Sequence, residues 1–258
     1  MNKINLFAIS ILTAISATAE KIEPYSGSRI FWDLSSKKTV FQSGIYSRII
    51  ELQDGRLLAV AEGGGINISL SDNGGKSWSS ANRIINNPDK VNYAVPDLLQ
   101  LKDGTIIIGY NPRPNKPYSS DRKFGIRALR STDGGKTWSE PIFVFDADYT
   151  GENGCWEPCF LELPSGELQC YFADESPYTS SNEQQISMCR SFDKGLTWSK
   201  PVKVCFRAGS RDGMPVPVLL DNKEIAVIIE DNGWPGRDGK FTATTVRCPL
   251  SDNWGNGF

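Results

Sequence analysis

The sequence contains no histidine. This absence excludes the Ser-His-Asp and Cys-His pairs that activate nucleophiles, and it excludes zinc sites built on imidazole. Any general acid or base must therefore be an Asp, Glu, Lys, Tyr or Cys side chain. A basic excess is absent too, because 28 Lys and Arg stand against 30 Asp and Glu. We expect no nucleic acid and no anionic lipid surface as a partner.

Long hydrophobic runs are missing everywhere except at the N-terminus. Residues 1–19 combine an early lysine, a short apolar stretch and the small residues Ala17-Thr18-Ala19. The apolar stretch is shorter than the roughly 20 residues that span a bilayer, and the layout is typical of a secretory signal peptide. We predict cleavage after Ala19, a secreted or periplasmic location, no membrane span, and a single domain over residues 20–258.

Cysteine is confined to the second half of the chain, at Cys155, Cys159, Cys170, Cys189, Cys205 and Cys248. The six residues lack the two close pairs of a zinc site, so we expect no metal and no cofactor. Export would permit disulfides. The spacing leaves two interpretations open, namely one or two structural disulfides or free buried thiols.

An internal repeat is the strongest pattern in the sequence. Ser131–Trp138 (STDGGKTW) matches Ser191–Trp198 (SFDKGLTW) and Ser71–Trp78 (SDNGGKSW), with the three tryptophans spaced 60 residues apart. A shorter fourth copy is Ser251–Trp254. In such a motif Ser and Asp side chains bond the backbone of the turn and glycine supplies a positive φ angle. The motif therefore predicts a structural turn and no catalytic group.

A strand, a tight turn and a second strand precede each copy of this motif. The four segments cover residues 48–61, 96–110, 158–172 and 215–229. Each has apolar residues on both sides of an Asp-Gly, Ser-Gly or Asp-Asn turn, the signature of a hairpin. With a third strand before the repeat motif and a short fourth after it, each repeat forms a four-stranded antiparallel blade. The sequence predicts an all-β propeller with about four blades.

The Ser-x-Asp-x-Gly-x-Thr-Trp repeats resemble the Asp boxes of the sialidase-like, six-bladed propeller superfamily. Four repeats over residues 46–254 are two fewer than that fold needs, so the resemblance implies a truncated propeller; the alternative is a closed ring of four blades. Because blades bury their faces against one another, a truncated ring should expose apolar residues of the first and fourth blades. The candidates are Phe41, Ile49, Leu58, Val218, Ile225 and Val227.

Polar residues gather where the first strand of each blade begins and where the second returns. In a propeller both points lie at one mouth of the axial channel. Two carboxylates stand out there, because Glu157 lies between Trp156 and Pro158 and Glu230 ends an apolar run. Apolar neighbours raise the pKa of a carboxyl group, which suits a proton donor. Two carboxylates on either side of a sugar hydrolyse glycosidic bonds, so we predict that Glu157 and Glu230 are catalytic.

The other residues at this mouth are predicted to bind substrate. They are Arg48, Glu62, Asp97, Asn111, Trp156, Asp174, Arg211 and Asp212. Trp156, Trp234 and Tyr178 are candidates for stacking on sugar rings. Two alternatives stay open, namely core packing for Trp156 and salt bridges for the two arginines.

Two families within the superfamily resemble this chain. Similarity to exo-sialidases at Tyr46–Ile49 implies that Arg48 would bind a sialate carboxylate, but Ala173-Asp174 stands where the second arginine belongs and Gly63–Gly65 replaces the loop Asp. The chain is more similar to the exo-arabinanases of glycoside hydrolase family 93. Their catalytic glutamates occupy a Trp-Glu-Pro segment and the end of the second strand of blade four, and Glu157 and Glu230 match both positions.

The second resemblance implies an exported, retaining glycoside hydrolase. Its expected substrate is an arabinan-like or related oligosaccharide or polysaccharide. Which glutamate is the nucleophile stays open. The alternatives are an exo-sialidase and a non-catalytic carbohydrate-binding propeller.

Overall fold

The computed structural model describes residues 33–236 and 238–255. The chain divides into two units, Met1–Lys37 and Lys38–Phe258. The described part of the first unit holds a short 3-10 helix, η1 (Leu34–Ser36), whose first turn is capped by Asp33. The predicted signal peptide lies outside the described residues. Within residues 33–236 and 238–255, no helix has the length and apolar character to cross a bilayer.

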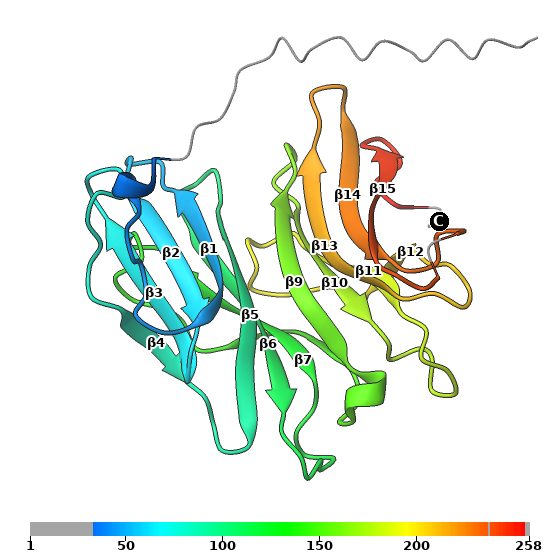
Figure 1. Cartoon of the computed structure of the whole chain (residues 1–258). Helices are drawn as coiled ribbons and strands as arrows, with labels where there is room; N and C mark the ends of the chain where they lie inside the picture. Colours follow the sequence, from blue (N-terminus) through cyan, green and yellow to red (C-terminus); the bar gives the residue numbers. More distant parts are fainter. Residues whose placement is uncertain (1–32, 237, 256–258) are drawn as a thin grey trace, which may run out of the picture. The chain divides into compact units, whose positions relative to one another are not determined.

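The second unit consists of four antiparallel sheets in which the strands keep their chain order (Figure 1). The first sheet contains β1 (Ile45–Glu51), β2 (Leu57–Glu62), β3 (Gly65–Ser71) and β4 (Asn82–Asn86). The second contains β5 (Val91–Gln100), β6 (Ile106–Pro114), β7 (Gly125–Ser131) and β8 (Ile142–Asp146).

The third sheet follows a single turn of 3-10 helix, η2 (Gly151–Asn153). It contains β9 (Cys155–Glu162), β10 (Leu168–Asp174), β11 (Gln185–Ser191) and β12 (Val202–Cys205). The fourth contains β13 (Asp212–Leu219), β14 (Glu224–Asp231) and β15 (Thr242–Pro249). The predicted all-β fold is confirmed. The fourth sheet differs from the prediction, because it has three strands in the part of the chain that the structure describes.

The hairpin between the first two strands of each sheet uses the same turn. Gly55, Gly104 and Gly166 adopt left-handed backbone angles, and Lys223 holds the equivalent place in the fourth sheet with φ 63°. Each of these four residues donates its backbone N–H to the carbonyl of a leucine three positions earlier. The turn alignment inferred from the sequence therefore extends to all four repeats.

The Asp boxes lie between the third and fourth strands of the first three sheets, as predicted. In the box Ser131–Trp138, Oδ1 of Asp133 accepts hydrogen bonds from the backbone N–H groups of Lys136 and Thr137, both at 3.0 Å. Ser131 Oγ accepts from the N–H of Gly135 at 2.9 Å. These side chains satisfy the turn's own backbone, so the boxes are structural elements.

Three apolar cores separate the successive sheets. The innermost strands neighbour one another in the order β1, β5, β9 and β13. Trp138 packs against the core between the first and second sheets, Trp198 against the next, and Trp254 lies within the core between the third and fourth. Each of these tryptophans therefore seals its sheet onto the preceding one.

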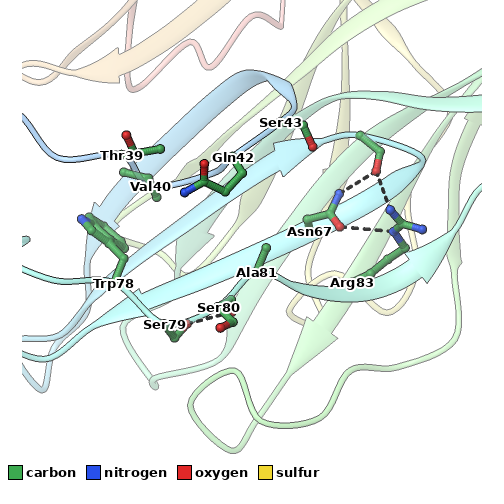
Figure 2. Close-up of a pocket in the computed structure, with 11 residues that line it drawn as sticks. Thr39, Val40, Gln42, Ser43, Asn67, Trp78, Ser79, Ser80, Ala81 and Arg83 are labelled. Carbon is green, nitrogen blue, oxygen red and sulfur yellow. Dashed lines mark hydrogen bonds between the residues drawn. The ribbon is translucent and has the colours of Figure 1, made fainter.

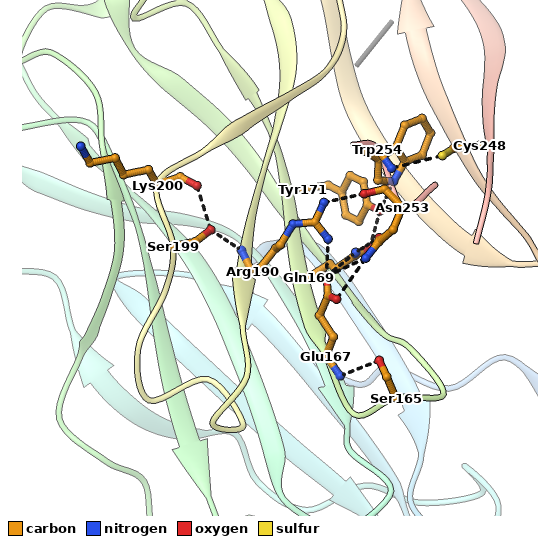
Figure 3. A network of polar contacts seen from close by, with 10 residues as sticks. All are labelled: Ser165, Glu167, Gln169, Tyr171, Arg190, Ser199, Lys200, Cys248, Asn253 and Trp254. Atoms are coloured by element: carbon orange, nitrogen blue, oxygen red, sulfur yellow. Dashed lines mark hydrogen bonds and ion pairs between the residues drawn. The ribbon is translucent and has the colours of Figure 1, made fainter. Parts of the chain in front are cut away.

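The shortened fourth repeat is held by polar contacts to the third sheet (Figure 3). Asn253 Oδ1 accepts a hydrogen bond from Gln169 Nε2 at 2.6 Å, and Trp254 Nε1 donates to the Tyr171 hydroxyl at 2.8 Å. Arg190 forms an ion pair with Glu167 and also donates to the Asn253 carbonyl. This network joins the fourth repeat to the third sheet.

The outer faces of the first and fourth sheets expose apolar side chains. Ile49 is 49% exposed and Val218 is 43% exposed, so these two faces do not cover each other. Phe41 is partly buried. The prediction is wrong for Leu58, Ile225 and Val227, which are buried because their side chains point into the cores between sheets. All six cysteines are free thiols.

Candidate functional site

A β-bulge occurs at the same place near the start of all four innermost strands. Each bulge contains one residue in the left-handed region, and these residues are Tyr46, Val95, Glu157 and Met214, with φ between 45° and 60°. The ladder register shifts at each of these places. Non-glycine residues rarely adopt such angles, and strained backbone of this kind concentrates at functional sites. In the third sheet the bulged residue is the predicted catalytic Glu157.

The bulge of one sheet is bonded by a carboxylate of the sheet before it. Glu157 Oε2 accepts the backbone N–H of Met214 at 3.0 Å. Glu62, at the end of β2, accepts the N–H of Val95 in the same way. Because both carboxylates satisfy an amide that the bulge removes from the ladder, the two bonds fix neighbouring sheets at the axial mouth.

A cleft of about 240 Å³ is formed by the third and fourth sheets, and both predicted catalytic glutamates line it. Its lining residues are Gly151, Trp156, Glu157, Glu175, Gln184, Arg211, Gly213, Glu230 and Phe241. Glu230 pairs with Gly213 across the β13–β14 ladder. A Cβ atom at Gly213 would lie 3.8 Å from Oε2 of Glu157. The Glu157 carboxylate therefore lies beside the strand that pairs with the strand of Glu230.

The two carboxyl groups have different surroundings. Glu157 is partly buried, whereas Glu230 is exposed. Burial raises the pKa of Glu157, the Met214 N–H and the Arg113 charge oppose that rise, and the charges of Glu230 and Glu175 add to it. A raised pKa keeps a carboxyl group protonated to higher pH, as a general acid requires.

The part of the cleft wall that contains Trp156, Glu175 and Arg211 is held together by polar contacts. Glu175 accepts a hydrogen bond from Trp156 Nε1 at 2.7 Å and forms an ion pair with Arg211. Arg211 also donates to the carbonyl of Asn182 at 2.6 Å and to Gln184 Oε1 at 2.9 Å. The Trp156 ring is therefore fixed as a flat apolar surface in the cleft. The guanidinium of Arg211 is engaged by the protein itself.

A second depression, of about 180 Å³, lies on the other side of Glu157. Arg48 and Asp97 line it together with Glu157. Asp97 accepts the backbone N–H of Phe160 at 3.0 Å, and burial raises the pKa of this carboxyl group. The structure therefore places Arg48 and Asp97 near Glu157 but outside the cleft that contains Glu230.

Four of the predicted substrate-binding residues lie in the interior and line neither depression. They are Glu62, Asn111, Asp174 and Asp212. Asn111 donates to the carbonyls of Gly125 at 2.7 Å and Cys155 at 3.0 Å, and Asp174 accepts from the hydroxyls of Ser176 and Ser187. Their positions support an architectural role, because their polar atoms are used to join strands at the mouth.

Asp212 differs from the other three. Its Oδ1 is buried without a hydrogen-bond partner among the described residues. Burial, and then the charge of Asp231 across the ladder, raise the pKa of Asp212 to about 6. Asp231 itself is paired with Arg207 at 2.6 Å.

Of the three aromatic candidates, Trp156 alone lines the cleft. Tyr178 is stacked on Phe206 with ring centroids 4.8 Å apart, and its hydroxyl donates to Gln185. Trp234 is 49% exposed, with the Arg207 guanidinium 5.9 Å from its ring centroid. Trp156 is therefore the stacking candidate that the geometry supports.

Sequence reasoning missed Glu175, Gln184 and Phe241 in the cleft, and it missed Arg113, which lies over the Trp156 ring. A signal existed for two of them. Side chains two residues apart share one face of a strand. Glu175 follows Ala173 by two positions and Arg113 follows Asn111 by two, so extending each second strand by one step would have found both. Gln184 and Phe241 lie before their strands and carry no such signal.

A larger depression of about 490 Å³ lies on the first sheet (Figure 2), and neither Glu157 nor Glu230 lines it. Arg83 donates to Asn67 Oδ1 at 3.2 Å and to the Gly63 carbonyl at 3.0 Å, so these lining groups are bonded to one another. Trp78 of the first Asp box lines this depression, where the equivalent tryptophans of later sheets meet a preceding sheet. Its lining contains no carboxylate and offers no acid–base chemistry.

Comparison with known proteins agrees with this architecture. The BNR/Asp-box repeat family matches residues 129–140. A curated sialidase of Bacteroides fragilis is 24% identical over 131 residues, which cover 43% of this chain and 24% of that protein.

Two solved structures have the same fold. The Penicillium chrysogenum α-L-arabinanase complexed with arabinobiose is 23% identical with a TM-score of 0.63, over 79% of this chain and 62% of that one. The α-L-arabinofuranosidase of glycoside hydrolase family 93 from Fusarium graminearum, also with arabinobiose, is 24% identical with a TM-score of 0.64, over 82% and 64%. This chain therefore spans less than two thirds of each relative. The repeated Asp boxes and the four serial antiparallel sheets give this chain the fold of the Asp-box, sialidase-like propellers.

Proposed function

We propose that this protein is a retaining glycoside hydrolase that acts on a neutral, arabinan-like oligosaccharide, with Glu157 and Glu230 as its two catalytic carboxyl groups. One observation carries the proposal: these two glutamates come from different sheets and line a single cleft beside a fixed tryptophan ring. A carboxyl pair with an aromatic surface is the equipment that glycosidic bond cleavage needs.

The chemistry divides between the two groups. One carboxylic acid protonates the glycosidic oxygen while the other carboxylate attacks the anomeric carbon, so that the C–O bond breaks and a glycosyl-enzyme ester forms. Water then attacks the ester, giving its proton to the first carboxylate and releasing the sugar. The raised pKa of Glu157 favours this residue as the acid and base, and the exposed Glu230 as the nucleophile.

The cleft favours a neutral sugar. The guanidinium of Arg211, which lines the cleft, forms an ion pair with Glu175 and a hydrogen bond with Gln184. Little positive charge is therefore left to bind a substrate carboxylate. The arabinanase and the arabinofuranosidase that share this fold were each determined with arabinobiose. A neutral pentose oligosaccharide therefore fits both the electrostatics of the cleft and the structural likeness.

The test is hydrolysis of linear arabino-oligosaccharides and of an aryl α-L-arabinofuranoside by the full chain. Glu157→Gln and Glu230→Gln should each lower kcat/KM by about 100-fold or more, the scale of a lost general acid or nucleophile, with the melting temperature retained. Glu224→Gln at the opposite end of β14 is the matched control and should keep full activity. Equal activity of all three variants would overturn the proposal.

Azide rescue assigns the two roles. A Glu157→Ala variant rescued by azide should give a glycosyl azide of retained configuration, because azide then attacks the covalent intermediate. A Glu230→Ala variant should give the inverted azide, because azide replaces the missing nucleophile. The opposite pair of products would reverse the assignment.

Sialidase activity is the second candidate, and the curated relative of Bacteroides fragilis favours it. The position that would hold a second arginine is filled by Ala173 and Asp174, both buried. An aryl sialoside offered beside the arabinofuranoside separates the two activities, and cleavage of the sialoside alone would replace the arabinan proposal. Saturable sugar binding without turnover would indicate the third alternative, a non-catalytic carbohydrate-binding propeller.

A further inference from the structure

Arg113 lies near the end of β6 and is not among the residues that line the cleft. Its Nε donates to Asn111 Oδ1 at 2.7 Å. Asn111 is itself fixed by the carbonyls of Gly125 and Cys155, and Cys155 begins the strand that carries Glu157. The Arg113 guanidinium is therefore bonded to the buried side-chain amide of Asn111, which itself connects the second sheet to the third.

The Arg113 guanidinium also lies over an aromatic ring. The guanidinium carbon is 5.0 Å from the centroid of the Trp156 ring. Nη2 of Arg113 is buried and has no hydrogen-bond partner among the described residues. A cation in this position is rigid and poorly solvated, and no hydrogen-bonded anion neutralises its charge.

The charge of Arg113 acts on two carboxylates. Burial lowers the pKa of Arg113, and the charges of Glu157 and then Glu62 oppose that change. Among the side-chain charges that act most on Glu157, Arg113 is the positive one, whereas Glu230 and Glu175 are negative. Arg211 also lines the cleft, but it is neutralised by Glu175. Arg48 lies on the far side of Glu157, near Asp97 and Cys159.

We propose that Arg113 is a positioning residue for Glu157. It supplies the fixed positive charge that balances the ionised carboxyl of Glu157, and it holds the Trp156 ring from behind. It acts through these two residues and not by contact with the sugar. This inference rests on the proposed function only in calling Glu157 catalytic; the electrostatic relation between Arg113 and Glu157 holds without turnover.

The direct test is a carbon-13 NMR titration of the glutamate side chains, with the Glu157 signal assigned by its loss in Glu157→Gln. In Arg113→Met, which keeps the length of the side chain and removes the charge, the pKa of Glu157 should rise by about one unit, the order expected for one charge at this range. Arg113→Lys keeps the charge and should restore most of the wild-type value. An unchanged pKa in Arg113→Met, or equal values in the Met and Lys variants, would overturn the proposal.

Arg127→Met is the matched control. Arg127 also lies over an aromatic ring, Phe143, at 5.0 Å, but its ion pair is with Asp146 on the outer strands of the second sheet. Its loss should leave the Glu157 titration in place. A shift as large as that of Arg113→Met would mean that any lost cation has the effect, and the specific role of Arg113 would be rejected.

One outcome is that Arg113→Met unfolds at neutral pH because the charge of Glu157 is no longer balanced. In that case the variant must fold at a pH low enough to protonate Glu157. A variant that is unfolded at both pH values would contradict the proposal. Where the wild type hydrolyses the arabinoside, the limb of its kcat/KM profile that reports Glu157 should move with the NMR value. A titration shift without any hydrolysis would reject the proposed function and leave the role of Arg113 standing.

Discussion

Single residues at the axial mouth carry unusual conformations and charges. Glu157 combines a left-handed backbone, a bond to the bulge of the next sheet and a raised pKa. The bulge turns its side chain away from the regular alternation of the strand, and the proline that follows disfavours a helical alternative. A residue that would otherwise be an ordinary strand glutamate is thereby directed to the cleft.

Asp212 makes the stability of the protein depend on pH in a defined sense. Its pKa is about 6 in the folded chain against an ordinary value of 3.8. A raised carboxyl pKa means that the folded state holds the proton more tightly, so this group's stabilisation is complete below pH 3.8 and is lost as pH rises towards 6. The side chain in Asp212→Asn cannot ionise, so the stability of this variant should lack the fall that Asp212 causes as pH rises. We expect the variant's stability relative to wild type to be higher at pH 7.5 than at pH 4.5 in urea unfolding.

Asp133→Asn is the contrasting control for this experiment. Hydrogen bonds in its Asp box lower the pKa of Asp133, so its stabilisation is present above the ordinary pKa and is lost on acidification below it. The difference between this variant and wild type should therefore stay constant from pH 4.5 to 7.5. A constant difference for Asp212→Asn as well would contradict the assignment of the pH dependence to Asp212.

At the scale of elements, the Asp box does its work through its tryptophan. Trp198 contacts Phe160 with ring centroids 5.9 Å apart and packs on the core between the second and third sheets. Trp78 occupies the same place in its box but lines the open depression of the first sheet. The same motif therefore stabilises the protein to different degrees in different repeats.

Replacing these two tryptophans separates the motif from its context. Trp198→Ala should lower the free energy of unfolding by about 3 kcal/mol, the lower end for loss of a large aromatic from a core. Trp78→Ala should cost about 1 kcal/mol or less, because little packing is lost at an open face. Chemical denaturation measures both values. Equal costs would mean that the box turn, and not the interface, determines the contribution of the tryptophan.

At the scale of the whole propeller unit, four sheets pack in series and the first and fourth each keep an apolar outer face. Ile45, Ile49, Val216, Val218 and Ile228 are between 43% and 60% exposed. Exposed apolar patches of this kind favour association with other apolar surfaces. The faces are expected to cause concentration-dependent self-association of the protein.

Charged substitutions test this expectation. The double variant Ile49→Lys with Val218→Lys should sediment as a smaller species than the wild type at the same concentration, while its melting temperature stays the same. Leu58→Lys is the control, since Leu58 is fully buried on the strand that pairs with β1, and it should unfold the first sheet. A melting temperature of the double variant as low as that of Leu58→Lys would show that the two faces are packed in solution.

The sequence by itself determined the repeat, the hairpins and the register of the mouth. Asp boxes and turn glycines act through local backbone geometry, so they can be recognised within eight residues, and Lys223 could be placed by counting alone. The spacing of residues from these turns also predicted the positions of Glu157 and Glu230, which the structure brings to one cleft. Trp156 and Arg211 were predicted at that site as well, on the same basis.

Only the tertiary structure decided which polar residues face the cleft and which join the sheets. Asn111 and Asp174 have the right positions along their strands, but their partners come from other strands and bury them. Glu175 and Arg113 gain their roles from Trp156, which meets each of them across the fold. The balance of burial and charge at a carboxyl depends on distances between segments far apart in the chain. The spacing of apolar residues along the sequence shows the period of a strand. It does not show which residues of other strands will lie beside it in the fold.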